Sequence, residues 1–219
     1  MMPLQNRVTP KGDILALPER GIFMGNRGIL HDETQRLGVP RWRHRHWVTC
    51  LLAFKGWHRE VMQPRAYTEL FFLDEPSALA AGHRPCALCR RPDYIAFQDA
   101  LKKALHRSQF LSADGLDRML HAARIETGRR QRRFEAGLDD LPSGSMVILP
   151  KSDDPGGESD IWLLWDKSLL RWRPGGYDRL ISRLDGTTAT VLTPRPTILT
   201  LQQGYQPILH PSAKELMGI

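Results

Sequence analysis

The sequence predicts an α+β protein with two parts, in which helices and short strands come first and strands dominate the second part. Two observations predict this class. Apolar residues recur at helical spacing over residues 94–105 and 116–123. From about Leu141 onward, short apolar stretches alternate with turn residues instead. The change of pattern separates an N-terminal α+β domain at 1–138 from a β-rich C-terminal domain at 139–219.

The first forty residues are rich in turns. Apolar pieces at 14–17 and 21–24 are separated by Pro18 and followed by glycines, which predicts short strands joined by tight loops. The turn at 25–28 has glycines that could let it hold an anion, although it lacks the spacing of a phosphate-binding loop.

Residues 41–54 alternate between two kinds of side chain. Arg41, Arg43 and Arg45 fall on one face, whereas the other face is aromatic, histidine-rich and apolar and includes Cys50. This alternation predicts a strand with a cationic face and a buried face. The cations interleave with aromatic residues, which suits contact with phosphates and bases. A solvated strand face with a packed reverse side is the competing interpretation.

A second strand and a helix are predicted next. The aromatic and apolar run at 67–73 has the composition of a strand. Asp74 is a suitable N-cap for a helix at 76–81, and Gly82 is its C-terminal stop.

Two longer helices and an arginine run complete the first part of the chain. Pro92 opens one helix and Ser112 caps the other. The arginine-rich run at 129–133 follows and is typical of a solvated helix end or a linker.

The second part of the chain is predicted to be mainly strands. Strands are expected at 145–149 and 188–192, and a hairpin at 161–172 turns at Asp166 and Lys167. A short helix is expected at 197–203. The hairpin carries three tryptophans, which could line an aromatic pocket but are better explained as the core of a small β domain: Trp162, Trp165 and Trp172.

Composition narrows the function classes. The 31 basic and 24 acidic residues leave a net charge of +7, and the sequence pI is about 9.7. This balance favours a polyanionic partner, most often nucleic acid. No signal-peptide core or membrane-length apolar run is present, so the sequence predicts a cytoplasmic protein without a membrane partner. Three cysteines do not make a disulfide framework.

Two of these cysteines form a C-x-x-C turn. Cys86 and Cys89 stand ahead of a basic helix, and this spacing lets two sulfurs act as adjacent ligands of a tetrahedral zinc ion, each at about 2.3 Å. Simple packing of a turn and a thioredoxin-like redox pair are the alternatives.

The run at 69–90 resembles the second half of the Ada-type metal-binding domain, in which a Phe-Phe strand leads through an Ala-rich helix into Gly-x-Arg-Pro-Cys-x-x-Cys. The resemblance covers about residues 67–91. It implies a small αβ zinc-knuckle module, at about 41–107, that binds one zinc ion through cysteines. In repair proteins of this family, one zinc thiolate accepts a methyl group from a DNA methylphosphotriester.

The resemblance also implies a ligand set. Cys86 and Cys89 match the family's second pair, and Cys50 falls where the first pair begins. Phe54 stands where the fourth cysteine would be, so one ligand is missing. Histidine could replace it, and the nearby candidates are His44, His46, His58 and His83. Cys50 is equally well explained as a buried packing residue.

These observations predict a zinc-containing nucleic-acid-binding protein, with DNA as the expected partner and a role related to DNA repair. A phosphate-facing patch around the knuckle would consist of Arg84, Arg90 and Arg91. One alternative is an enzyme acting on nucleic acid, either with Cys50 as methyl acceptor or with His58 and Glu60 as a hydrolase. Another is an interaction protein that keeps a relic knuckle.

Overall fold

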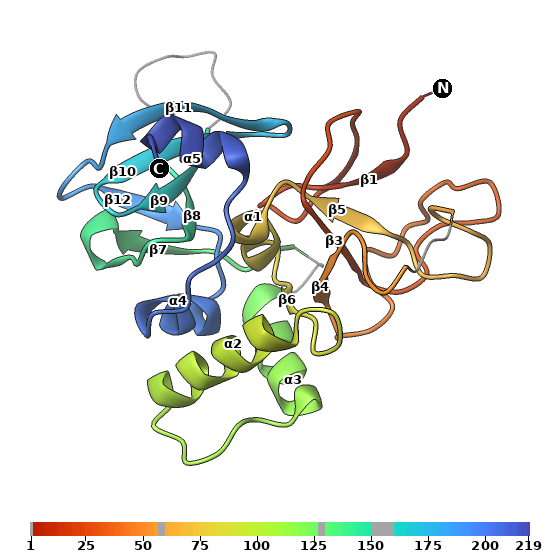
Figure 1. The fold of residues 1–219 in the computed structure, drawn as a ribbon, viewed down its shortest axis with the longest axis horizontal. Helices are drawn as coiled ribbons and strands as arrows, with labels where there is room; N and C mark the ends of the chain where they lie inside the picture. The colour runs from red at the N-terminus through yellow and green to blue at the C-terminus, as the bar shows by residue number, and fades with distance from the viewer. Residues whose placement is uncertain (1, 57–59, 127–129, 150–159) are drawn as a thin grey trace.

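The computed structural model describes residues 2–56, 60–126, 130–149 and 160–219, and it contains two six-stranded sheets with the helix α1 between them (Figure 1). The first sheet has the order β2-β1-β5-β3-β4-β6 and the second the order β11-β10-β9-β8-β12-β7. The coarse α+β class is confirmed.

The elements fall in the following order along the chain. The first sheet contains β1 (Gln5–Val8), β2 (Ile14–Ala16), β3 (Phe23–Asn26), β4 (Val48–Leu51), β5 (Leu70–Phe72) and β6 (Arg84–Pro85). The second contains β7 (Phe134–Gly137), β8 (Ser145–Ile148), β9 (Ile161–Trp165), β10 (Ser168–Arg173), β11 (Gly176–Ser182) and β12 (Thr188–Val191). The helices are α1 (Glu75–Ala80), α2 (Arg91–Ala104), α3 (Ala113–Arg124), α4 (Arg195–Gln202) and α5 (Pro211–Met217).

Helix α1 begins and ends one residue before its predicted bounds, with the predicted cap and stop. The Asp74 carboxylate accepts a hydrogen bond from the Ser77 amide at 3.0 Å and so caps the helix. Gly82 follows with φ of +85°, and a Cβ there would lie 2.4 Å from the side chain of Arg124. Only glycine fits this position, because it tolerates both the left-handed backbone and the close approach.

The prediction of one long strand at 41–54 is wrong. Only β4 is a strand, and residues 41–47 form an irregular segment. Some of its hydrogen bonds are local, such as that from the Trp47 indole to the His44 carbonyl, and others reach α3, such as that from Arg45 to Asp114. They do not form the ladder of a continuous strand. The alternation of cations and aromatics therefore does not create a single cationic strand face.

The predicted β hairpin is confirmed, and a further strand that was not predicted pairs with it. β9 and β10 pair antiparallel, with Ser168 opposite Trp165, and β11 pairs with the outer edge of β10. Trp162 is 6% exposed and Trp172 is 8% exposed, and each lies in a hydrophobic cluster. The hairpin tryptophans at these two positions are core residues rather than the lining of an aromatic pocket.

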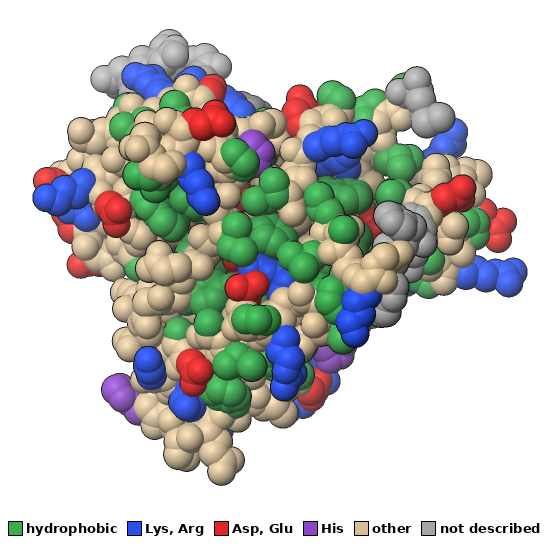
Figure 2. All heavy atoms as spheres, viewed as in Figure 1, with side chains coloured by type: hydrophobic (Ala, Val, Ile, Leu, Met, Phe, Trp, Pro, Cys, Tyr) green, Lys and Arg blue, Asp and Glu red, His purple; other side chains and the backbone are tan. Residues whose placement is uncertain are grey.

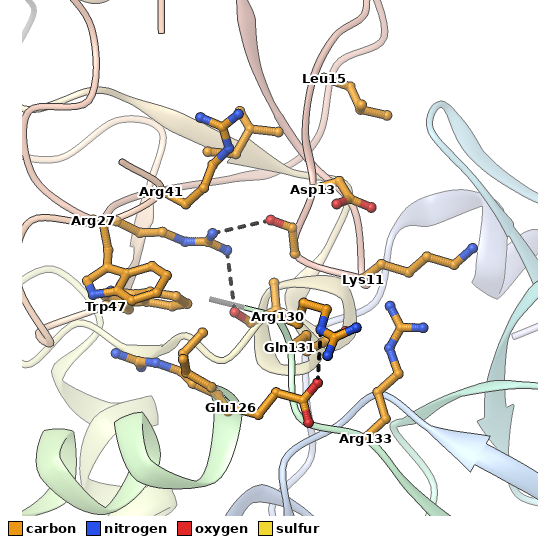
Figure 3. A pocket seen from close by; sticks show the side chains of 16 residues that line it. Lys11, Asp13, Leu15, Arg27, Arg41, Trp47, Glu126, Arg130, Gln131 and Arg133 are labelled. Atoms are coloured by element: carbon orange, nitrogen blue, oxygen red, sulfur yellow. Dashed lines mark hydrogen bonds and ion pairs between the residues drawn. The ribbon is translucent and has the colours of Figure 1, made fainter. Parts of the chain in front are cut away.

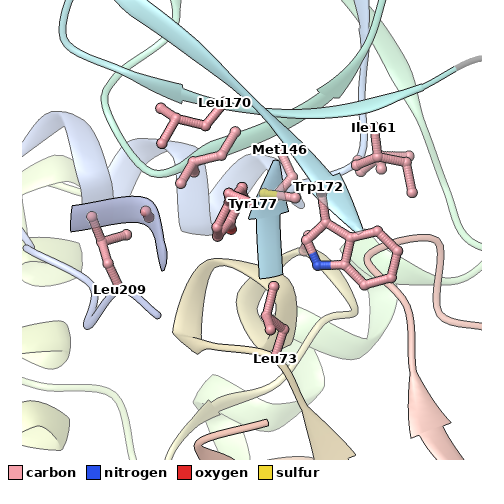
Figure 4. Close-up of a cluster of buried hydrophobic side chains, with 11 residues drawn as sticks. Leu73, Met146, Ile161, Leu170, Trp172, Tyr177 and Leu209 are labelled. Carbon is pink, nitrogen blue, oxygen red and sulfur yellow. The ribbon is translucent and has the colours of Figure 1, made fainter. Parts of the chain in front are cut away.

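The core crosses the position at which the sequence predicts a domain boundary. One buried cluster combines Leu73 and Ala80 with Met146, Trp172 and other side chains of the second sheet (Figure 4). A second cluster joins α2 and α3 to α4, through Phe97 and Leu201 among others, and includes Tyr205 just after α4. The segments on either side of residue 138 are thus packed around shared apolar clusters.

Two buried carboxylates attach the last part of the chain to α1. Glu75 accepts hydrogen bonds from the Tyr205 hydroxyl at 2.6 Å and from the Ile208 amide at 2.9 Å. Asp74 accepts from the Tyr177 hydroxyl at 2.9 Å and from the His210 amide at 3.3 Å.

The surface is mixed in charge. On the face seen in Figure 2, Lys and Arg side chains are interspersed with acidic ones around an apolar centre. Within the described residues, no helix is both long enough and apolar enough to cross a membrane.

Candidate metal centre

The three cysteines converge at one edge of the first sheet. β4 and β6 pair in parallel with Thr49 opposite Pro85, so Cys50 and Cys86 are neighbours just beyond this pair. The Cys86 amide donates to the Thr49 carbonyl at 3.0 Å and fixes this register. The sulfurs of Cys50, Cys86 and Cys89 all lie within 4.8 Å of one another.

Cys50 lies on the opposite face of β4 from the one predicted. Thr49 is completely buried, whereas Cys50 is only partly buried, as are Cys86 and Cys89. The core side of β4 is therefore the side of Thr49. The Cys50 side chain is directed toward Cys86 and Cys89 rather than toward the hydrophobic core.

Backbone amides point at the sulfurs of the turn. The Leu88 amide donates to Cys86 Sγ at 3.4 Å, and the Cys89 amide also donates to Cys86. The Leu51 amide donates to Cys89. Because a hydrogen bond to the charged form of an acid favours ionisation, these amides stabilise thiolates.

The three thiols are shifted in opposite directions, because the pKa of Cys86 is lowered whereas the pKa values of Cys50 and Cys89 are raised. Hydrogen bonds from Cys50 and Cys89 lower the pKa of Cys86 to about 2. Donation to Cys86 raises the pKa of Cys50 well above its ordinary value. The cluster thus favours a thiolate at Cys86, and thiolates are the form in which cysteine binds metal.

The residues fit a soft metal ion such as zinc. Three converging cysteines are soft donors, and the amides that donate to sulfur supply the outer shell common in metal sites. Among the described residues, no histidine or carboxylate joins the three sulfurs within the same 4.8 Å.

The histidine candidates for a fourth ligand are placed as follows. His83 is completely buried, and its two ring nitrogens bond to the Val48 carbonyl and to the Arg27 guanidinium. The Nδ1 atom of His46 bonds to Asp117 at 2.8 Å. His44 also lies outside the sulfur cluster, and His58 lies outside the described residues.

Two of the predicted phosphate-binding arginines are buried in ion pairs. Arg84 is 4% exposed and pairs with Asp117 at 2.8 Å, and Arg90 is 1% exposed and pairs with Glu75 at 2.8 Å. Their guanidinium groups cannot reach a nucleic acid at the surface, which corrects their assignment to the patch. The sequence could not reveal this, because the partner carboxylates are 15 and 33 residues away.

The other predicted cations are exposed. Arg91 begins α2 beside the knuckle, and Arg41 and Arg43 lie in the irregular segment before β4. Arg45 is also exposed but pairs with Asp114 at 2.6 Å. Glu60, predicted as a hydrolase residue, is exposed.

Sequence reasoning did not identify the amide donors of the knuckle, because a backbone contact leaves no signature in side-chain pattern. It also did not identify Arg27 and Arg124, which are buried beside Trp47. The turn at 25–28, with its possible anion, was the only signal that pointed to Arg27.

Comparison of the chain with protein-family models, with curated proteins and with solved structures finds no match.

Proposed function

We propose that this is a zinc-containing nucleic-acid-binding protein in which Cys50, Cys86 and Cys89 hold the metal. The observation that supports it best is the convergence of the three sulfurs within 4.8 Å. They come from a strand and a turn that are 36 residues apart in sequence. Three cysteines that merely filled space would not require backbone amides directed at their sulfurs.

Zinc at this position would be structural. It would tie the edge of β4 to the turn before α2, where β6 contributes only two residues to the sheet. Bound zinc supplies folding free energy at such sites, because the ligands do not form a site in the unfolded chain.

Charge supports nucleic acid as the partner. The net charge of +7 attracts a polyanion, and Arg41, Arg43 and Arg91 are exposed. We assign phosphate contact to these three and leave out the ion-paired Arg45, Arg84 and Arg90. DNA is the first partner to test, because the resemblance to the Ada-type domain points to it.

Metal content tests the first half of the proposal. Protein purified without added metal should contain close to one zinc per chain by elemental analysis. The Cys86→Ser variant should contain almost none, whereas Ala87→Ser, a change of similar size in the same turn, should keep it. A folded parent protein without metal would overturn the zinc proposal.

Salt-dependent binding tests the second half. The affinity for a fluorescent DNA duplex and for a single strand should fall as salt rises, since bound cations release condensed counterions. Arg91→Glu should weaken binding and reduce the slope by about one counterion. Arg179→Glu, an exposed change on β11, is the matched control. Binding that is absent at low salt would contradict the proposal.

A further inference from the structure

A cavity of about 590 Å³ lies beside the segment before β4, and most of its charged residues are cations (Figure 3). It shares Arg41 with the surface proposed above to contact nucleic acid. It is bounded by the β1–β2 turn, the segment before β4, the end of α3 and the segment leading to β7. The cations that line it are Lys11, Arg27, Arg41, Arg124, Arg130 and Arg133. Among the described residues that line it, the acidic ones are Asp13 and Glu126.

The inner wall is a stack of two guanidinium groups and one indole. Arg27 lies 4.0 Å and Arg124 3.7 Å from the ring centroid of Trp47. All three side chains are at most 2% exposed. The cation–π contacts fix the planes of both arginines, so that neither needs to be ordered when a ligand arrives.

Neither inner arginine has a carboxylate partner. Arg27 donates to the carbonyls of Gly12 and Ala81, and Arg124 donates to those of Gly82 and Arg45. Across the described residues, neither forms an ion pair with Asp or Glu.

The two acids of the cavity do not neutralise this wall. Glu126 pairs with Arg130 at 3.4 Å, and Asp13 acts on Arg27 only through space. Burial lowers the pKa of Arg27 to about 9 and also lowers that of Arg124. Unpaired buried charge is costly, and an anion in the cavity would reduce that cost.

Among the described residues of the lining, two buried polar atoms lack a hydrogen-bond partner. They are the Nε donor of Arg124 and the Oε1 acceptor of Gln131. The amide nitrogen of Gln131 is fully engaged with the carbonyls of Pro10 and Ala80, so its orientation is fixed. A ligand that suits both atoms carries acceptor oxygens and a hydrogen-bond donor.

We propose that this cavity binds a nucleotide by its terminal phosphate. A phosphate monoester is a dianion with three acceptor oxygens, which suits several guanidinium groups better than a single carboxylate does. The volume lies within the range of small-molecule sites and exceeds what inorganic phosphate needs. Sugar hydroxyls or base amines supply the donor for Gln131.

The phosphate has two possible sources, a free nucleotide or the end of a nucleic-acid strand. The second rests on the proposed nucleic-acid function and the first does not. Calorimetric titration with AMP and with adenosine tests the free form. Titration with a thymidine oligonucleotide bearing a 5′-phosphate or a 5′-hydroxyl tests the strand end. In at least one of these pairs, the phosphorylated member should bind at least tenfold more tightly.

Variants of the outer wall locate the site without disturbing the core. Arg133→Glu places a negative charge in the lining and should weaken binding of the phosphorylated ligand at least tenfold. Arg132→Glu, its exposed neighbour outside the lining, should change the affinity less than twofold. Circular dichroism verifies that both variants are folded.

The outcomes separate this inference from the proposed function. Equal affinity for the phosphorylated and unphosphorylated members of both pairs would overturn it, as would equal effects of the two variants. DNA binding without any phosphate preference would therefore reject the phosphate site and leave the DNA proposal intact. Loss of zinc in Cys86→Ser with unchanged AMP affinity would leave the phosphate site in place.

Discussion

Two pairs of arginines are buried to the same degree, but they differ in what surrounds them. Arg84 and Arg90 are at most 4% exposed and are paired with carboxylates. Arg27 and Arg124 are at most 2% exposed, and they bond to carbonyls and lie against an indole. Carboxylates of the same chain neutralise the charges of the first pair, whereas the second pair has no carboxylate partner among the described residues.

The role of a buried cation depends on the groups that surround it. A paired guanidinium already has the groups that its charge requires, so its role is to hold the fold together. A guanidinium that lacks such a partner and lines a cavity leaves a favourable position for an external anion. Burial alone therefore does not distinguish a structural arginine from a binding one.

The largest change in the free energy of unfolding is expected when the Glu75–Arg90 ion pair is broken. Glu75→Gln removes the charge that neutralises Arg90, whereas Asp93 remains at 2.9 Å as a second partner. Breaking a buried pair costs about 3 kcal/mol of unfolding free energy, the low end of the usual range, because of that second partner. Urea denaturation measures the change. Glu215→Gln, on an exposed position of α5, should leave the free energy unchanged. If Glu75→Gln changed the unfolding free energy as little as Glu215→Gln, the ion pair with Arg90 would not stabilise the fold.

An increase in unfolding free energy of similar size is expected when an anionic ligand binds next to Arg27 and Arg124. AMP at 100 times its dissociation constant should raise the unfolding free energy by about 2.7 kcal/mol, because it binds only the folded state. Thermal denaturation with and without AMP measures this. Adenosine at the same concentration should give no shift. An equal shift in Arg133→Glu would place the stabilising site elsewhere.

A smaller change in stability is expected when the pH is lowered. Burial lowers the pKa of His83 well below its ordinary value, and the nearby charge of Arg27 adds to this. The folded state then binds fewer protons than the unfolded chain, so stability is lost as pH falls below the unfolded pKa of about 6.5. The loss is at most about 1.4 kcal/mol per pH unit for one such group.

Urea denaturation at pH 7.5 and pH 5.5 measures this slope. His83→Gln should flatten it, whereas His106→Gln, at an exposed position, should not. His44 and His121, whose pKa values are also lowered by burial, will keep part of the slope. An unchanged slope in His83→Gln would show that His83 is not the group responsible.

The smallest effect is expected at the surface. Arg45 and Asp114 form an ion pair in which both side chains are more than two-fifths exposed. Water and salt screen such a pair. Asp114→Asn should therefore leave the urea midpoint unchanged within error. A clear loss of stability would show that the segment before β4 depends on this contact.

The sequence was sufficient where local chemistry decides the structure. The Asp74 cap, the Gly82 stop, the Ser112 cap and the hairpin around Asp166 all depend on residues close in sequence, and all are present. The convergence of Cys50 with the C-x-x-C turn, implied by the family resemblance, is also present.

The sequence was insufficient where distant residues decide. The strand predicted at 41–54 is shortened because Trp47 turns inward and is enclosed by Arg27 and Arg124, which are 20 and 77 residues away. Arg84 and Arg90 were assigned to a surface patch because their carboxylate partners could not be known. Long-range pairing of charges has no local pattern from which to predict it.

The attachment of Tyr205 to Glu75 joins residues 130 positions apart. At about 5 to 20 residues per second, the ribosome makes the second roughly 6 to 26 s after the first. During that interval α1 and α2 exist without Leu201 and Tyr205, which later cover part of their apolar surface. A nascent chain in this state presents an apolar surface, and its Glu75 carboxylate has Arg90 as a partner but lacks the Tyr205 hydroxyl. Such a chain is prone to aggregate until α4 emerges.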